Sequence, residues 1–169
     1  ICLNCVQDAK GQVKPPLALD ARGYSDRIVL RYIPSSSIFF NEGNRKGYRV
    51  ERADYVKGVP NDKLVYKPID GSPFMRMNNK DWENAIRLEQ AKDSASAKLA
   101  ILAMAYSDPG SLSGGDVLKE GLKSLKEQQS NANIKFGYSM IAANQSTLAA
   151  KALGVSATDL DVKVGKGYV

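Results

Sequence analysis

The sequence contains no histidine. Histidine is the commonest general base and the commonest metal ligand in proteins. Its absence excludes every nucleophile that a Ser–His or Cys–His pair would activate. Any catalysis would have to rest on carboxylates, lysine or tyrosine, and we expect neither a cofactor nor a metal site.

Cysteine is almost as scarce, with only Cys2 and Cys5. Their spacing is typical of a redox motif or of half a zinc site. No βαβ pattern follows the pair, and no second pair of ligands is present in the sequence. The rest of the chain has no cysteine, so we expect no disulfide within its body.

Long apolar runs are also missing, because none reaches the roughly 18 residues that a membrane span requires. The net charge is +6, from 24 basic and 18 acidic residues that are interspersed along the chain. A nucleic-acid interface would instead gather its basic residues on one face. The pattern predicts an ordinary solvated surface; the alternative is weak attraction to anionic glycans or acidic partners.

The N-terminal segment, residues 1–11, pairs a short apolar run with the small residues Ala9 and Gly11. Small residues at this spacing are typical of a signal-peptidase site, here before Gln12. We interpret the segment as the remnant of a signal peptide, which predicts an exported protein, extracellular or at the cell surface. The alternative is an N-terminal arm, structured as an ordinary strand.

Residues 12–78 have the character of β structure. Apolar residues alternate with polar ones in 27–33 and 48–53, as in strands with one buried face. Residues 41–47 are polar with two glycines, which predicts a loop. The expected extended segments are 17–21, 27–33, 38–40, 48–53 and 64–66.

Residues 79–154 change in composition and become rich in Ala, Leu, Lys, Glu and Gln. We expect three to five helices here, the first capped by Asn78 or Asn79 with Asp81 in its first turn. The others are expected at 94–106, after a cap at Asp116, and within 134–153, where Gly154 ends the block. Residues 155–169 should return to β structure, with a strand at 161–164.

Three stretches carry a resemblance to a known family. Leu30-Arg31-Tyr32-Ile33-Pro34 and Gly47-Tyr48-Arg49-Val50 are similar to the second and third strands of fibronectin type III domains. Val162-Lys163-Val164-Gly165-Lys166-Gly167-Tyr168 resembles the approach to the sixth strand. The sequence departs from the family at Tyr32, where tryptophan is usual, and at Val164, where proline is usual.

The resemblance implies a role for each matching residue. Tyr32, Tyr48 and Val50 would face the core, and Tyr168 would be the corner tyrosine whose hydroxyl bonds back to the backbone. More specifically, the chain is similar to secreted fibronectin type III proteins of Bacteroidota, which carry a helical segment between their strands.

These observations predict an α+β fold, a fibronectin type III-like antiparallel β-sandwich with a mostly helical insertion. Residues 12–78 would form the front strands, 79–154 the insertion and 155–169 the return strand. The sequence stops within the expected sixth strand, so the sandwich is incomplete as it stands. We therefore expect the sheet edge beside Tyr168 to be paired by another chain or by a continuation of the same chain, or else to be frayed.

Two short patterns suggest covalent modification. Asp93-Ser94-Ala95 resembles the O-glycosylation pattern of Bacteroidota, which makes Ser94 a candidate, and a chance match is the competing interpretation. Asn144-Gln145-Ser146 fits the N-glycosylation sequon, which applies only in a eukaryotic host.

Other chemistry is set against a simpler interpretation in each case. The carboxylate pairs Glu83 with Glu89 and Asp159 with Asp161 fit a solvated helix face and a turn better than a catalytic pair. Residues 113–116 fit a helix cap better than an anion site, because they lack the Lys-Ser/Thr of a phosphate loop. The aromatic residues of the helical block fit core packing better than a sugar platform; they are Trp82, Tyr106, Phe136 and Tyr138.

The predicted function is a non-catalytic structural or adhesive module that acts through protein–protein contacts in a secreted or cell-surface assembly. The alternatives are a carbohydrate-binding accessory module of a larger surface protein and a virion surface protein. A hydrolase that uses two carboxylates is the catalytic alternative. No nucleic-acid partner is expected.

Overall fold

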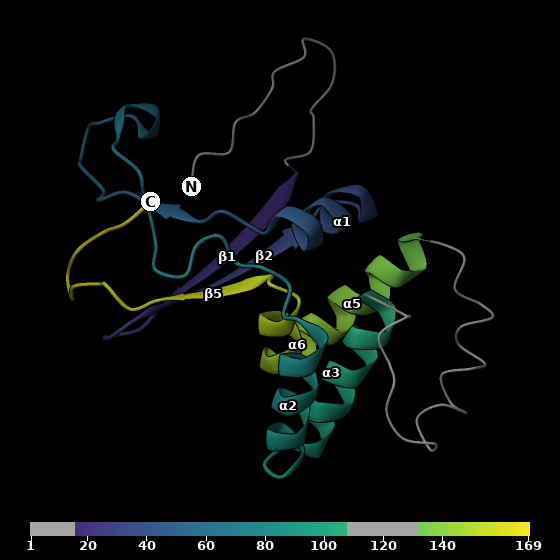
Figure 1. Cartoon of the computed structure of the whole chain (residues 1–169). Helices are drawn as coiled ribbons and strands as arrows, with labels where there is room; N and C mark the ends of the chain where they lie inside the picture. Colours follow the sequence, from purple (N-terminus) through teal and green to yellow (C-terminus); the bar gives the residue numbers. More distant parts are fainter. Residues whose placement is uncertain (1–15, 108–131) are drawn as a thin grey trace, which may run out of the picture.

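The computed structural model describes residues 16–107 and 132–169 (Figure 1). Its fold is α+β, as the sequence predicts. The described elements in chain order are β1 (Leu17–Gly23), β2 (Ile28–Pro34), α1 (Ser37–Lys46), β3 (Glu51–Arg52), the 3-10 helix η1 (Asn61–Lys63), β4 (Lys67–Pro68), α2 (Asn79–Gln90), α3 (Ser94–Ser107), α5 (Ala132–Gln145), α6 (Thr147–Ala152) and β5 (Ser156–Asp159).

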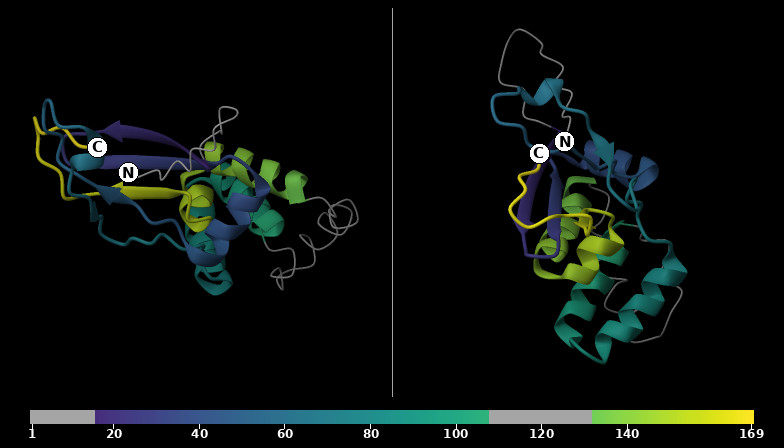
Figure 2. Two further views of the ribbon diagram at one scale, coloured as in Figure 1. Left: turned by 90° about the horizontal axis from the view of Figure 1, so that it is seen from above. Right: turned by 90° about the vertical axis from the view of Figure 1, so that its left-hand side faces the viewer.

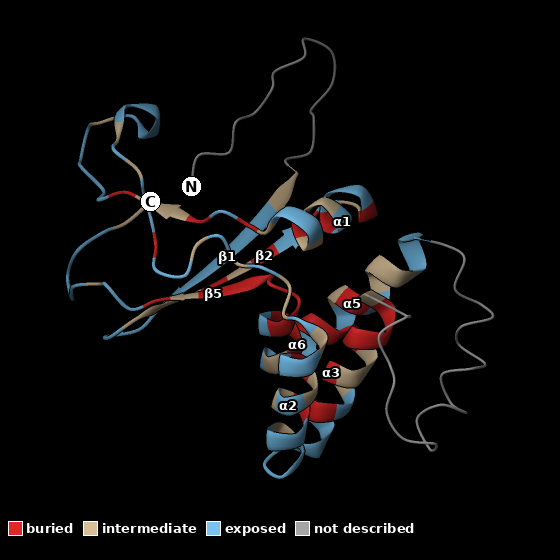
Figure 3. Ribbon diagram, viewed as in Figure 1, coloured by how far each residue is buried: buried red, intermediate tan, exposed pale blue. Residues whose placement is uncertain are grey.

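The larger sheet has three antiparallel strands in the order β1-β2-β5. β2 is its central strand, and Leu30 lies opposite Ala21 of β1 and Ala157 of β5. The side chains of Leu30 and Tyr32 point into the core, because alternate residues of a strand share a face. β1 forms an edge of this sheet and is exposed along almost its whole length (Figure 3).

A second, smaller β layer covers one face of that sheet. β3 pairs with β4, and Tyr48 just before β3 forms an antiparallel bridge with Phe74. Residues 167–169 add to the other side of β3, since Ala53 and Val169 exchange backbone hydrogen bonds of 2.8 and 3.0 Å. The ring of Tyr48 lies 5.1 Å from that of Tyr32, centroid to centroid, and joins the two layers.

The helices α2, α3, α5 and α6 lie between β4 and β5 in the sequence and gather at one end of the sheet (Figure 2). α3 is apolar almost all round and buried against α5, α6 and α2. Small residues let the helices approach closely, and the hydroxyls of Ser96 and Ser146 lie 2.8 Å apart where α3 meets α6. Among the described residues, no helix combines the length and hydropathy that crossing a membrane requires.

Several predicted helix boundaries are confirmed. Asn78 caps α2 by accepting a hydrogen bond from the N–H of Asp81. Gly154 follows α6 with a φ of +71°, a conformation that glycine adopts without a steric penalty. The helix expected after Asp116 lies outside the described residues, as do Cys2 and Cys5.

The extended segment expected at 38–40 and the loop expected at 41–47 are wrong, because residues 37–46 form helix α1. Ser36 caps this helix by accepting a hydrogen bond from the N–H of Phe39. One turn further along, Phe40 and Gly43 share the buried face. A run of three apolar residues suggested a strand, whereas the cap and this helical spacing decide the structure.

Two expected strands are also displaced. The segment 161–164 is not a strand; β5 lies earlier, at Ser156–Asp159, and the N–H of Asp161 turns back to the carboxylate of Asp159 at 3.1 Å. The segment 64–66 is preceded by η1, and the strand begins only at Lys67. In both cases a local turn fixes where the strand lies, and the side-chain alternation alone did not reveal it.

The packing of Tyr48 onto α1 can be tested at Gly43, where a Cβ atom would overlap the Tyr48 ring. We expect Gly43→Ala to lower the free energy of unfolding by about 1–3 kcal/mol, because overpacking outweighs the better helix propensity of alanine. The matched control is Gly137→Ala in α5, where a Cβ atom meets nothing within 4 Å. This control should raise stability by up to about 1 kcal/mol. Equal effects of the two substitutions in urea unfolding would contradict the packing described.

Candidate functional site

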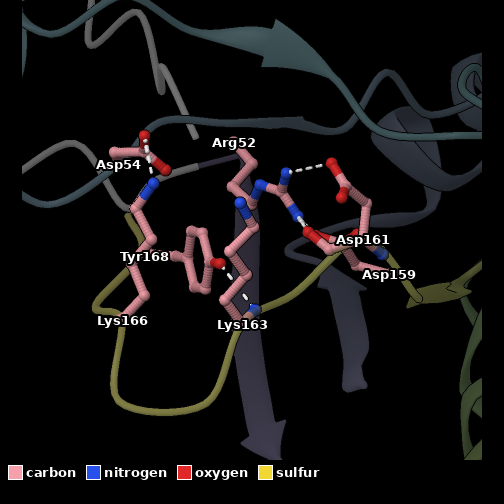
Figure 4. Close-up of polar contacts among 7 residues, drawn as sticks. All are labelled: Arg52, Asp54, Asp159, Asp161, Lys163, Lys166 and Tyr168. Carbon is pink, nitrogen blue, oxygen red and sulfur yellow. Dashed lines mark hydrogen bonds and ion pairs between the residues drawn. The ribbon is translucent and has the colours of Figure 1, made fainter. Parts of the chain in front are cut away.

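A charged pocket of about 340 Å³ lies where the C-terminal turn meets β3 and β4. Seven of its lining residues interact with one another, and Figure 4 shows them. They come from the β3 segment, the end of β5 and the turn that follows it: Arg52, Asp54, Asp159, Asp161, Lys163, Lys166 and Tyr168. The pocket therefore lies across both β layers.

Arg52 is the centre of this cluster. One nitrogen of its guanidinium lies 2.6 Å from the carboxylate of Asp159, and the other lies 2.9 Å from that of Asp161 (Figure 4). The same group also donates to the backbone carbonyl of Asp161. Asp159 is only 5% exposed and Arg52 21%, so this pair is partly shielded from solvent. Burial alone lowers the pKa of Arg52, but hydrogen bonds to Asp161 and Asp159 raise it above its ordinary value.

Tyr168 contacts both the turn that follows β5 and the guanidinium of Arg52. Its hydroxyl accepts a 2.8 Å hydrogen bond from the backbone N–H of Lys163, five residues earlier. The guanidinium of Arg52 lies over its ring, 4.7 Å from the centroid. Lys166 donates a 2.7 Å hydrogen bond to Asp54, which lowers the pKa of the Asp54 carboxyl. The turn is thus anchored to the β3 segment at both ends.

The geometry of the carboxylates bears on the catalytic alternative. Asp159 and Asp161 both accept from the single guanidinium of Arg52, so they serve as its counter-charges. Glu83 and Glu89 are six residues apart on α2 and therefore lie on different faces of the helix. Within residues 16–107 and 132–169, no group of three or more Cys, Asp or Glu side chains is placed to hold a metal ion.

The structure brings the three predicted core residues together. Tyr32, Tyr48 and Val50 are 4–6% exposed and belong to one buried cluster. Burial raises the pKa of both tyrosine hydroxyls, and the nearby Tyr48 raises that of Tyr32 further. Tyr168 is half-buried and lies at the charged pocket, beside Arg52.

Three of the four helical aromatic residues are buried or half-buried. Trp82 and Tyr106 are buried, and Tyr138 stacks on Tyr106 with ring centroids 4.7 Å apart. Phe136 lies 5.7 Å from Phe40 of α1. These contacts agree with core packing for Trp82, Tyr106 and Phe136, whereas Tyr138 is 43% exposed.

The candidate glycosylation residue Ser94 is the first residue of α3 and is exposed. It follows Asp93, whose carboxylate accepts hydrogen bonds from the N–H groups of Ala95 and Ser96 and so caps the helix. A capping role accounts for the acid at this position. Glycosylation of Ser94 stays a prediction.

Sequence reasoning missed the pairing of Arg52 with Asp159, which are 107 positions apart. The sequence offered one signal for a distant basic partner. Asp159 and Asp161 lie two residues apart, and no Lys or Arg lies between them to balance their charge. No protein-family model matches the chain, and neither a curated protein nor a solved structure matches it.

The hydrogen bond from Lys163 to Tyr168 can be tested by Tyr168→Phe, which removes the acceptor and retains the ring under Arg52. We expect the free energy of unfolding to fall by about 0.5–1.5 kcal/mol, and the amide hydrogen of Lys163 to exchange faster. The control is Tyr24→Phe, an exposed tyrosine that keeps its cation–π contact with Arg27. Unchanged exchange at Lys163 would show that the tyrosine hydroxyl does not hold the turn.

Proposed function

We propose that this chain is a non-catalytic structural or adhesive module of a secreted or cell-surface assembly, built on a fibronectin type III-like sandwich. It acts through protein–protein contacts at an open edge of its smaller β layer. The observation that carries the proposal is the unpaired backbone of β3 beside the C-terminal segment. The expected export rests on the pattern of residues 1–11.

Three features support the sandwich. The sheet β1-β2-β5 is antiparallel and faces a second layer made of β3, β4 and residues 167–169. Tyr32 and Tyr48 meet between the layers, at the positions where the family resemblance puts core residues. The hydroxyl of Tyr168 bonds to the backbone a few residues upstream, which is the contact that defines a tyrosine corner.

The open edge follows from the alternation of hydrogen bonds along β3. Val50 accepts from Ile69 on the β4 side, whereas Ala53 and Tyr55 bond to the C-terminal segment on the opposite side. Antiparallel pairing alternates sides from residue to residue, so the backbone groups of Arg49 and Glu51 point to the same side as those of Ala53. No described residue pairs with them there.

An edge of this kind is a template for an added strand, from another chain or from a continuation of this one. Beside it, an apolar groove of about 160 Å³ runs between the two layers and is lined by Leu30, Val50, Ile69 and Val169, among others. A strand that paired with Arg49 and Glu51 would continue the line of residues 167–169. Its alternate side chains would enter this groove, because every second residue of a strand points to the same face.

The experiment selects a displayed library of random peptides on the chain and compares binding to the unmodified chain with binding to Glu51→Pro. Proline removes the outward N–H of Glu51, which makes no hydrogen bond within the described part of the chain. We expect the selected peptides to alternate apolar and polar residues and to bind Glu51→Pro at least about tenfold more weakly, because strand pairing depends on main-chain hydrogen bonds.

Glu51→Ala is the matched control, since it removes the same side chain and keeps the N–H. It should bind the peptides as the unmodified chain does. Peptides that bind Glu51→Pro and the unmodified chain equally would contradict the proposal. So would a glycan array that gave specific binding in place of peptides, because the carbohydrate alternative would then hold.

A further inference from the structure

A second unpaired edge belongs to β1, on the side of that strand opposite β2. Tyr24 bonds to Arg27 at the hairpin turn, and Ser35 bonds to Pro16 at the open end of the hairpin. Between these two points, the backbone N–H and C=O groups of successive β1 residues point alternately toward β2 and away from it. Consequently Ala18, Asp20 and Arg22 bond to β2, and the backbone groups of residues 17, 19, 21 and 23 point outward, where no described residue pairs with them.

The charges of this strand are complementary to those of a second copy of itself. When two β1 strands pair antiparallel and are centred on Ala21, Asp20 of each copy lies opposite Arg22 of the other. In the single chain both side chains are mostly solvent-exposed, at 60% and 74%, and their own contact is 3.6 Å long. The register centred between residues 19 and 21 instead sets Asp20 against Asp20, which like-charge repulsion disfavours.

The shape of the strand is complementary in the same register. Leu19 of one copy lies opposite Gly23 of the other, and Gly23 has no side chain and nothing within 4 Å of the space where a Cβ would lie. Gly23 pairs with Ile28 of β2 within its own chain. The Leu19 side chain is 39% exposed in the single chain, and in the pair it lies over Gly23 toward Ile28, at the mouth of the apolar groove.

We propose that a second copy of this chain pairs with the first through β1, antiparallel and centred on Ala21. The two sheets become one continuous sheet in the order β5-β2-β1-β1-β2-β5. The three outward residues Leu19, Ala21 and Gly23 supply about six intermolecular backbone hydrogen bonds, two for each hydrogen-bonded pair. The twofold axis closes the assembly at two copies, because each copy uses the same edge.

Sedimentation velocity over a range of protein concentrations gives the dimer dissociation constant. In the proposed register, position 20 of each copy faces position 22 of the other. Asp20→Arg alone therefore sets arginine against arginine in both of these pairs, and Arg22→Asp alone sets aspartate against aspartate. We expect each variant to dimerise about tenfold or more weakly than the unmodified chain. Mixing the two variants in equal amounts should restore dimerisation, because each Arg then faces an Asp of the other chain.

The mixture separates this proposal from a folding defect, since an intramolecular effect of either substitution would persist after mixing. A second pair of variants tests the backbone bonds. Ala21→Pro removes the central outward N–H and should abolish the dimer, whereas Ala21→Thr keeps that N–H and should dimerise. The proposal would be overturned if the unmodified chain stayed monomeric up to high micromolar concentration, or if Asp20→Arg, Arg22→Asp and Ala21→Pro all left the dimer unchanged.

Discussion

The guanidinium of Arg52 lies between two β layers that share no continuous strand pairing. It holds the buried carboxylate of Asp159 at the end of β5 and the side chain of Asp161 in the following turn. Its face covers the ring of Tyr168, whose hydroxyl secures the backbone of Lys163. The position of the C-terminal segment beside β3, and thus the open edge in line with it, depends on this cation.

The edges of the two layers follow from where the helices lie. Helices α2, α3, α5 and α6 pack at one end of the larger sheet and share its hydrophobic core, to which they contribute mostly alanines together with Trp82 and Met104. None of these four helices pairs with the backbone of β1 or of β3. Proteins usually blunt such edges with charge, bulges or coverage. On β1 the only charged residues are Asp20 and Arg22, whose opposite signs permit antiparallel self-pairing in one register.

Sequence reasoning was reliable where one physical signal dominated. Alternation and the family resemblance placed Tyr32, Tyr48 and Val50 in the core, and composition with the Asn78 cap placed the helical block. It was wrong where local and distant signals compete, as at Phe39 and Phe40, which are apolar enough for a strand but belong to a capped helix. Arg52 and Asp159 are each ordinary surface residues in the sequence, and only the fold brings them together.

A double-mutant cycle on Arg52 and Asp159 tests most directly whether this ion pair joins the β layers. Arg52→Ala leaves the carboxylate of Asp159 buried without its partner and should lower the free energy of unfolding by about 3 kcal/mol. Asp159→Ala should cost a similar amount, and the double variant should lose clearly less than the sum, because no unpaired charge remains. Losses that add to within about 0.5 kcal/mol would contradict the account, since the two residues would then act independently.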